Sequence, residues 1–396
     1  MSNVAVIGWS ASAIGAVQSK PDDALHTLEH EMLAPVIIDA ISKAGVDRSQ
    51  VQSAIFTVPR PYTMQKYLHT FMIGQLRLAC SGTVMEVMGN GMTGALAFDQ
   101  ACAEIQLGRA EVALAVGINM ETATSASVHM MESMRATGDV DFQSIAGISP
   151  ISWYAMDAMR YMHDFGATPE QLAAVAVKNR HNASLNPLAQ FRDPITIDDV
   201  LNARRIVEPL GLLDVPGRSD GAACIVLATE AVARSTGKPF ALLRGRGFSH
   251  DGSHQIGDRY SDITALPAAM QAGAFAMKQA GVTARDIDVA ELYAPCTIVE
   301  ILVSEALGFF ERGKGGLAAL AGETGLQGKI PLSTSGGLTS RGHPAYVTSL
   351  YNIGELYDQL TGNAGARQVA NARLGLSSGE LGNYNAALVH ILEGIS

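Results

Sequence analysis

The chain of 396 residues is poor in cysteine, in charge and in long apolar runs. Its four cysteines have no CxxC spacing, and the N-terminus lacks the basic start of a secretory signal, so we expect a reduced, cytoplasmic protein. No stretch approaches the roughly 18 uninterrupted apolar residues of a transmembrane segment, which argues against a membrane protein. Lysine and arginine number 28 against 38 acidic residues, a net charge of −10, which argues against nucleic acid as a partner.

Charged residues make up only 17% of the chain, whereas 47% are hydrophobic. Such a composition excludes disorder and indicates much buried surface, including a subunit interface. The length suits two or three domain-sized units or one large α/β assembly.

Apolar strands and helical patterns alternate along the chain and then repeat. We expect strands near 4–15, 51–58 and 111–120, and helices over 29–44 and 94–108. GVDRSQVQSAIF near residue 45 is echoed by GVTARDIDVAEL near residue 281, and EVALAVGINM by NAALVHILEG. Two copies of one α/β unit are the simplest account: an N-terminal half over 1–235, with an inserted loop region about 120–225, and a C-terminal half over 236–396.

Two motifs match known ligand sites only weakly. GNGMTG at 89–94 fits the dinucleotide fingerprint, but it does not follow the first strand, so we interpret it as a strand-to-helix turn that brings backbone N–H groups to a ligand. His26, Glu29 and His30 form H-x-x-E-H without an evident third ligand, so we interpret them as a solvated helix face and predict no metal site.

Two segments carry stronger signals of chemistry. In SGGLTSRGHPA, residues 335–345, glycines and a proline flank His343 just before a helix and hold it as a donor or base. Tyr293 ends a buried strand in DVAELYAPCT, and strand ends in α/β folds face clefts.

With these segments, the sequence resembles the thiolase superfamily, and most closely its sterol-carrier-protein-x and lipid-transfer-protein-like branches. The matching blocks span almost the whole chain; they are RYMHDFGATPEQLAAVAVKNRHNASLNPLAQFRDPIT, EPLGLLDVPGRSDGAACIVLA and PLSTSGGLTSRGHP. The resemblance implies an α/β thiolase fold of two related βαβαβαββ halves in five α-β-α-β-α layers. It also implies a homodimer and an acyl-CoA substrate, with coenzyme A entering as part of the substrate and no covalently bound cofactor.

The catalytic positions depart from that family. A thiolase carries its nucleophile in a C-A-S-G turn, and the matching tetrad here is Gly91-Met92-Thr93-Gly94. Cys102 lies eleven positions later, about three helical turns away, and cannot substitute. The family's second cysteine is also absent, because the C-terminal turn reads LSSGELGN and Cys296 stands one position past the cysteine of the other motif. A covalent acyl-enzyme is therefore not expected.

One branch of these thiolases resembles this pattern, with glycine at the nucleophile position and tyrosine at the strand end. Its members are retro-aldolases that shorten steroid side chains held as β-hydroxyacyl-CoA thioesters, beside a small partner with an OB fold and a zinc ribbon. Gly91 and Tyr293 match that branch, whereas His343 stands where the branch has a second tyrosine, with Tyr346 three residues on. The resemblance implies Tyr293, His343 and Tyr346 as catalytic residues, and backbone N–H groups near Gly91 and Gly382 as an oxyanion hole.

Three functions stay open on the sequence: a carbon–carbon lyase, a cysteine-independent acyltransferase that performs a Claisen-type condensation, and an inert scaffold subunit. Cations in the loop region are candidates for the phosphates of coenzyme A; they are Lys178, Arg180, His181, Arg192, Arg204 and Arg205. A methionine-rich stretch either lines an acyl pocket or packs in the core; it comprises Met130, Met131, Met134, Met156, Met159 and Met162.

Overall fold

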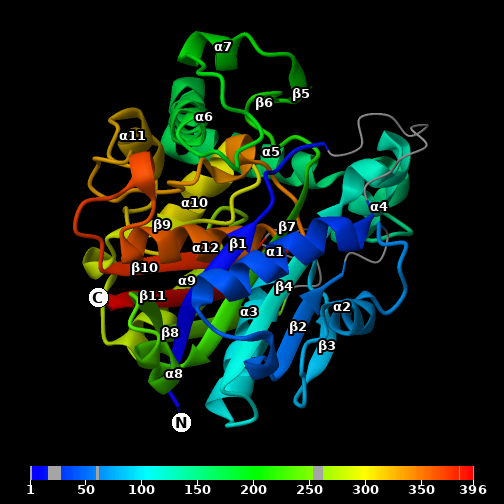
Figure 1. The fold of residues 1–396 in the computed structure, drawn as a ribbon. Coiled ribbons are helices and arrows are strands. Elements are labelled where there is room, and N and C mark those ends of the chain that lie inside the picture. Colours follow the sequence, from blue (N-terminus) through cyan, green and yellow to red (C-terminus); the bar gives the residue numbers. More distant parts are fainter. Residues whose placement is uncertain (1, 17–27, 59–61, 253–261, 383, 396) are drawn as a thin grey trace.

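The structure is a computed structural model that describes residues 2–16, 28–58, 62–252, 262–382 and 384–395. Its main strands are β1 (Val4–Ala11), β2 (Ser53–Thr57), β3 (Val84–Val87), β4 (Val112–Met120), β7 (Asp220–Thr229), β8 (Phe240–His250), β9 (Val289–Glu291), β10 (Leu374–Leu381) and β11 (Ala386–Ile395). They form one mixed sheet in the order β3-β2-β4-β7-β1-β8-β11-β10-β9 (Figure 1).

Helices cover and separate the strands. They are α1 (Glu29–Ala44), α2 (Leu68–Leu76), α3 (Thr93–Gln106), α4 (Ala126–Thr137), α5 (Pro150–Phe165), α6 (Pro169–Ser184), α7 (Ile197–Leu201), α8 (Glu230–Ser235), α9 (Pro267–Ala280), α10 (Thr297–Ala306), α11 (Gly315–Leu320) and α12 (Thr348–Thr361). The helix predicted over 29–44 is confirmed, because its apolar residues recur at helical spacing and Gly45 ends it in the left-handed region at φ 74°.

The two halves of the chain build the same strand pattern. In the first half β2 pairs in parallel with β4, β4 antiparallel with β7, and β7 antiparallel with β1. In the second half β9 pairs in parallel with β10, β10 antiparallel with β11, and β11 antiparallel with β8. Within the described strands, the two halves of the sheet meet where Ala5 and Val6 of β1 pair with β8. The repeat predicted from the sequence is therefore confirmed.

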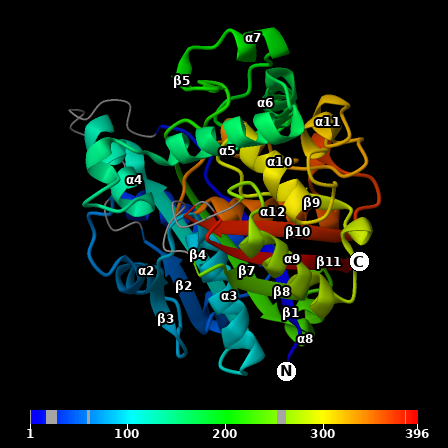
Figure 2. The same cartoon turned by 180° about the vertical axis from the view of Figure 1, so that it is seen from behind.

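Three large hydrophobic cores of the described residues fill the spaces between five layers of helices and strands. One core packs α1 and α2 against the outer face of the first half, and another packs α9 and α10 against the outer face of the second. The third core holds α3 and α12 between the two halves of the sheet. Figure 2 shows α9 lying over β8 and β11 on the outer face of the second half. The predicted α-β-α-β-α arrangement is confirmed.

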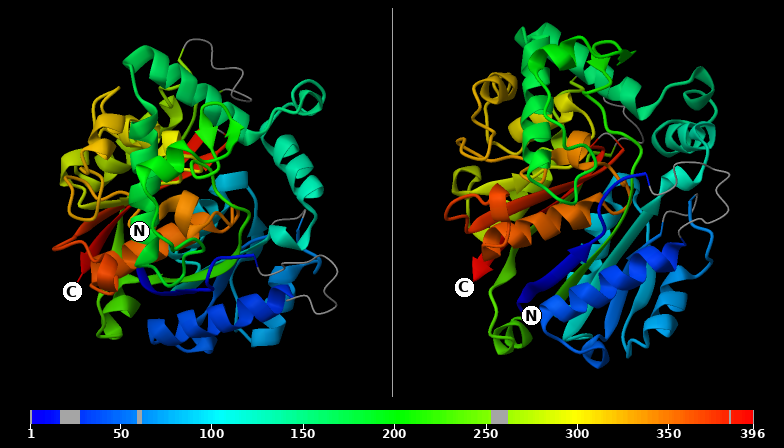
Figure 3. Two further views of the ribbon diagram at one scale, coloured as in Figure 1. Left: turned by 90° about the horizontal axis from the view of Figure 1, so that it is seen from above. Right: turned by 45° about the horizontal axis from the view of Figure 1, so that its top comes forward.

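Between β4 and β7 the chain leaves the sheet and forms α4 to α7, with a small ribbon of β5 (Arg205–Val207) and β6 (Leu210–Gly211). We call residues 121–219 the inserted segment. Figure 3 shows α4 projecting at one side of the molecule, away from the layered body. No helix in the described ranges is long and apolar enough to cross a membrane.

Candidate active site

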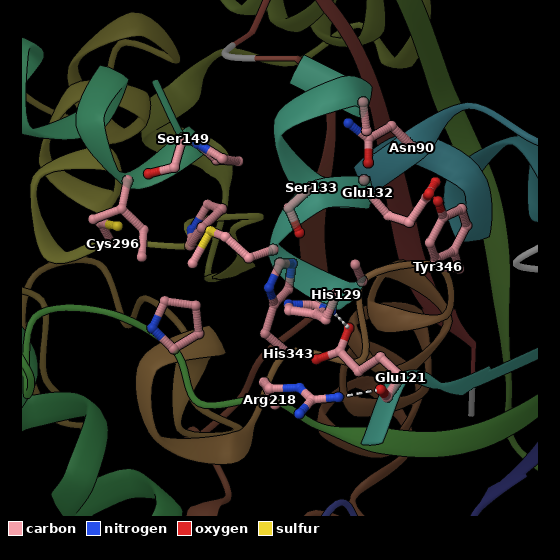
Figure 4. A pocket seen from close by; sticks show the side chains of 18 of the residues that line it. Asn90, Glu121, His129, Glu132, Ser133, Ser149, Arg218, Cys296, His343 and Tyr346 are labelled. Carbon is pink, nitrogen blue, oxygen red and sulfur yellow. Dashed lines mark hydrogen bonds and ion pairs between the residues drawn. The ribbon is translucent and has the colours of Figure 1, made fainter. Parts of the chain in front are cut away.

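A cavity of about 170 Å³ lies where turns from both halves of the sheet meet the inserted segment (Figure 4). We call it the central cavity. Its lining includes the side chains of Tyr62, Glu121, His129, Tyr154, Arg218, Tyr293, Cys296, His343, Tyr346 and Glu380, and the backbone of Gly91 and Gly382. The structure thus brings Tyr293, His343, Tyr346, Gly91 and Gly382, which the sequence analysis singled out, into one space.

Tyr293 and His343 form a hydrogen-bonded pair in the wall of this cavity. The Tyr293 hydroxyl lies 2.6 Å from His343 Nε2, and the two rings meet edge to face at 79°. Tyr293 is 1% exposed, and its backbone N–H donates to Ser378 Oγ at 3.0 Å while its carbonyl accepts from the Tyr384 hydroxyl at 2.5 Å. These bonds hold the phenol of Tyr293 in one position.

Burial keeps both partners neutral. It raises the pKa of Tyr293 well above its usual value, and the nearby carboxylate of Glu380 adds to the rise. Burial, followed by the charge of Arg341, lowers the pKa of His343 to about 3. At neutral pH the pair is therefore an uncharged phenol and an uncharged imidazole. Such a pair can pass a proton but does not hold a charge at rest.

The turn before His343 is held by buried ions. The carboxylate of Glu291 accepts from Ser335 N at 2.9 Å and from Ser335 Oγ at 2.7 Å, and Arg341 Nη1 donates to the same hydroxyl at 2.8 Å. Gly342 then turns the chain at φ 112°, a conformation that favours glycine, and the His343 N–H donates to Ser219 Oγ at 3.0 Å. The glycine-rich motif thus fixes the position of the imidazole.

Gly91 lies directly beneath the phenol of Tyr293. A Cβ atom built on Gly91 would lie 2.6 Å from the Tyr293 hydroxyl oxygen and 2.8 Å from Cζ. Contacts this short do not occur between unbonded atoms of these types, so Tyr293 occupies the space that a side chain at 91 would need. A nucleophile on residue 91 and the Tyr293–His343 pair are therefore mutually exclusive in this arrangement.

The cysteines do not replace the missing nucleophile. All four thiols are free, and burial raises the pKa of each. Cys296 lines the cavity at the start of α10, but its thiol is buried, and the carboxylates of Asp214 and Glu380 add to the rise in its pKa. A thiolate is the reactive form, so the cavity disfavours it.

A second tyrosine–histidine pair lines the cavity and was missed from the sequence. The Tyr62 hydroxyl lies 3.2 Å from His129 Nδ1, and the Tyr62 ring meets Tyr346 edge to face at 6.3 Å between centroids. Burial raises the pKa of Tyr346, and it lowers the pKa of His129 to about 4. Tyr346, predicted as catalytic, thus lies beside this second pair.

Two buried carboxylates were also missed. Glu121 directly follows β4, and Glu380 lies near the end of β10, the matching strand of the other half. The Tyr154 hydroxyl donates to Glu380 Oε1 at 2.7 Å. Burial raises the pKa of Glu121 to about 7. The signal that would have found them is an acidic residue at the end of an apolar strand, in INME and SSGE.

Two family models match the chain: the thiolase N-terminal domain over residues 4–231 and a thiolase C-terminal domain-like model over residues 249–394. The chain belongs to the thiolase family. An acetyl-CoA acetyltransferase of Methanothermobacter thermautotrophicus is 33% identical over 394 residues, 99% of either chain. A steroid side-chain-cleaving aldolase of Thermomonospora curvata is 37% identical over 211 residues, which cover 52% of this chain and 53% of that one.

Solved thiolase-fold structures match over the full length. The "Ltp2-ChsH2(DUF35) aldolase" has a TM-score of 0.83 at 26% identity, and the match covers 99% of this chain and 97% of that chain. Human mitochondrial 3-ketoacyl-CoA thiolase in complex with CoA has a TM-score of 0.74 at 14% identity, and the match covers 100% of this chain and 98% of that chain. The second likeness shows the fold alone.

The cations that the sequence predicts to bind the phosphates of coenzyme A separate into two groups. Lys178 Nζ donates to Glu300 Oε1 at 2.6 Å and to the Leu332 carbonyl at 2.8 Å, and Arg180 is buried with its Nε 3.2 Å from Ser340 Oγ. Both cations are therefore hydrogen-bonded within the protein, and a phosphate group would have to compete with these partners. The remaining four are exposed and stay predictions; they are His181, Arg192, Arg204 and Arg205.

Other sequence predictions need correction or lie outside the described residues. His26 of the H-x-x-E-H motif lies outside them, and Glu29 is buried, not solvated, because its Oε1 accepts from Met64 N at 2.5 Å. Within the described ranges no group of three His, Cys, Asp or Glu side chains is placed to hold a metal.

Of the methionine stretch, Met130 lines the cavity and is 45% exposed. Further members lie on the surface rather than in the core; they are Met131, Met156 and Met159.

Proposed function

We propose that this thiolase-family protein cleaves a β-hydroxyacyl-CoA by a retro-aldol reaction, giving a ketone or aldehyde and a shortened acyl-CoA without a covalent intermediate. The observation that carries the proposal is the overlap at residue 91. The phenol of Tyr293 takes the space of a side chain there, 2.6 Å from a Cβ position, so the cavity has exchanged a nucleophile for a proton-transfer pair. The aldolase relatives support the same reaction.

The chemistry needs a proton acceptor for the β-hydroxyl group. In our proposal that hydroxyl gives its proton to the Tyr293 oxygen while the Tyr293 proton moves to His343 Nε2. The Cα–Cβ bond breaks, Cβ becomes a carbonyl carbon, and the bonding electron pair moves to Cα to form a thioester enolate. Relay through Tyr293 avoids a phenolate, which burial disfavours. General acid–base help of this kind contributes roughly 10²- to 10⁴-fold.

The enolate needs donors near the thioester oxygen. Backbone N–H groups near Gly91 and Gly382, which line the cavity from opposite halves of the fold, are our candidates. Coenzyme A would enter as part of the substrate, with its phosphates at the exposed cations of the inserted segment. A steroid side chain is one substrate that an aldolase relative's name supports.

Partner subunits belong to the proposal as well. The aldolase structure carries ChsH2(DUF35) in its name, and a benzoylsuccinyl-CoA thiolase relative of Thauera aromatica, 31% identical over 352 residues, is a subunit named BbsB. We propose a homodimer that works beside a small OB-fold and zinc-ribbon partner. Co-purification of such a partner with the tagged chain, followed by mass measurement of the intact complex, tests both statements.

A cysteine-independent acyltransferase is the second candidate, and the 33% identity with an acetyl-CoA acetyltransferase over the full length favours it. It predicts acyl transfer between two thioesters rather than release of a carbonyl compound. An inert scaffold predicts coenzyme A binding with no turnover of either kind.

The deciding experiment incubates the protein, alone and with its partner, with a β-hydroxyacyl-CoA. We expect equal amounts of a carbonyl product and a shortened CoA ester, detected by mass spectrometry. Alkylation of the thiols should leave the rate unchanged. Thiolysis by free coenzyme A that alkylation abolishes would contradict the proposal.

A further inference from the structure

The proposed reaction leaves one proton unassigned, the one that the enolate takes up at Cα. Glu121 lines the central cavity together with the second tyrosine–histidine pair. Its Oε1 accepts from Ser219 N at 2.8 Å, and its Oε2 accepts from Asn119 Nδ2 at 3.2 Å and lies 3.8 Å from His129 Nδ1. Figure 4 shows the carboxyl group turned toward the His129 ring.

The nearest guanidinium does not neutralise this carboxylate directly. Arg218 Nη2 donates instead to the backbone carbonyls of Glu121 and Thr124. Asp220, on the neighbouring strand, adds a negative charge on the other side. Among the described residues no lysine or arginine is paired with this carboxyl group, and a buried carboxyl group whose donors are amides is able to hold a proton.

The charged and titratable groups near Glu121 come from several elements; they are Tyr62, His129, Arg218, Asp220, Tyr293 and Tyr346, and Glu132 of α4 lines the same cavity. Burial and Asp220 raise the pKa of Glu121 to about 7, whereas the pKa of His129 is lowered to about 4. Glu121 therefore exists in both protonation forms near neutrality, and His129 beside it is uncharged.

We propose that Glu121 is the acid that protonates Cα of the thioester enolate, with His129 and Tyr62 connecting it to solvent. The step rests on the proposed function and completes it. The neutral carboxyl group of Glu121 gives its proton to Cα, the enolate collapses to the thioester, and a carboxylate remains. Tyr293 keeps the proton of the β-hydroxyl group, His343 releases to solvent the proton that it took from Tyr293, and Glu121 regains a proton through His129, whose side chain is 21% exposed.

The reverse of this step is measurable without any carbon–carbon cleavage. The shortened acyl-CoA product, incubated with the enzyme in D₂O, should exchange its α-hydrogens for deuterium, because the Glu121 carboxylate removes a proton from Cα and returns a deuteron. Mass spectrometry of the thioester follows the exchange. We expect Glu121→Gln to lower the exchange rate by about 10²- to 10⁴-fold.

Asp358→Asn is the matched control. Asp358 is another carboxyl group whose pKa burial raises to about 7, but it accepts from Trp9 Nε1 at 2.9 Å and does not line the central cavity. We expect this variant to exchange at the wild-type rate. The wild-type exchange rate should also rise with pH through about 7, because the carboxylate is the active form, and that profile tests the role even where Glu121→Gln fails to fold.

The outcomes separate this inference from the proposed function. Exchange that depends on Glu121, in a protein that cleaves no β-hydroxyacyl-CoA, would overturn the lyase proposal and keep Glu121 as the group that handles the α-proton. Cleavage accompanied by no exchange in the wild type, or by exchange in Glu121→Gln within twofold of the wild type, would overturn the inference and leave the lyase standing.

Discussion

The central cavity contains two tyrosine–histidine pairs that differ in the length of their contact and in the exposure of their phenols, 1% for Tyr293 and 7% for Tyr62. The inner pair, Tyr293 and His343, comes from the second half of the fold; its hydrogen bond is 2.6 Å long and its phenol is 1% exposed. The outer pair, Tyr62 and His129, comes from the first half and the inserted segment; its contact is 3.2 Å long and its imidazole is 21% exposed. A carboxyl group, Glu121, lies beside the outer pair, with its Oε2 atom 3.8 Å from His129 Nδ1.

This difference separates two tasks that one residue pair performs poorly. A closely hydrogen-bonded, uncharged pair passes a proton within the cavity, but an imidazole with a pKa of about 3 is a weak store for it. A pair near solvent, beside a carboxyl group with a pKa of about 7, is able to store a proton and exchange it with water. In our proposal, therefore, the inner pair serves bond cleavage and the outer pair serves proton supply.

Removing the inner phenol should have the largest effect. We expect Tyr293→Phe to lower the rate of β-hydroxyacyl-CoA cleavage by about 10²- to 10⁴-fold, because the relay to His343 is lost. Tyr357→Phe is the control, since that buried hydroxyl donates to the Ile7 carbonyl at 3.2 Å, away from the cavity. Full cleavage rates in both Tyr293→Phe and His343→Ala would remove the inner pair from the mechanism.

Restoring the family's nucleophile should break the inner pair instead of creating a thiolase. In Gly91→Cys the new Cβ would lie 2.6 Å from the Tyr293 oxygen, so Tyr293 must move. We expect the rate of cleavage to fall by no more than it falls in Tyr293→Phe, and no thiolysis to appear. The free energy of unfolding should drop by about 1–3 kcal/mol. Chemical denaturation and a thiolysis assay measure these changes.

Gly74→Cys is the control for that experiment, because a Cβ on this glycine of α2 meets open space. It should keep both activity and stability. Adding Gly91→Cys to Tyr293→Ala should cost less stability than adding it to the wild type, and it should give no activity, because the side chains at 91 and 293 compete for one space. A Gly91→Cys protein that is as stable as the wild type and performs thiolysis would disprove the exclusion.

The sequence predicted the inner pair better than the outer one, for a physical reason. Tyr293 and His343 stand in short motifs whose glycines, prolines and strand ends constrain the backbone locally, so each could be recognised within about ten residues. His129 and Tyr62 lie 67 positions apart in segments with no such signal, and the tertiary placement of α4 beside the segment between β2 and α2 brings them together. Their contact is tertiary, and no local pattern encodes it.

The same distinction holds for the fold and the charged residues. The helix over 29–44 and the repeated strands follow from apolar periodicity, which burial enforces residue by residue. Lys178 looked like a phosphate ligand because a lone lysine in a loop region is usually solvated, whereas here Glu300, 122 positions away, binds it inside the protein. The side-chain partners of charged residues depend on contacts that composition does not reveal.

The outer carboxyl group should reveal itself in the pH dependence of stability. Folding raises the pKa of Glu121 from 4.5 to about 7, so the folded state holds a proton that the unfolded state has already released between these values. Stability is therefore complete below about pH 4.5 and falls as the pH rises to 7, by an amount on the order of 3 kcal/mol. Glutamine does not titrate, so the free energy of unfolding of Glu121→Gln, measured relative to that of the wild type, should rise by an amount on the order of 3 kcal/mol from pH 5 to pH 8.

Urea unfolding at pH 5 and pH 8 measures this gain directly. Asp358, which titrates in the same range, is present in both proteins and cancels in the comparison. If the variant and the wild type differ in free energy of unfolding by the same amount at both pH values, Glu121 is ionised throughout this range. The outer pair would then have no proton to supply.

The smallest effect should follow removal of the outer phenol. Tyr62→Phe deletes one hydroxyl that lies 3.2 Å from His129 Nδ1, a contact at the long end of the hydrogen-bond range. Loss of this hydrogen bond costs about 1 kcal/mol, which corresponds to at most roughly a fivefold fall in rate. The fall should be larger for α-deuterium exchange than for cleavage. Because His129 keeps its own access to solvent, its proton supply to Glu121 survives. A loss as large as that of Tyr293→Phe would mean that the two pairs act as one chain, and the division of labour between them would be wrong.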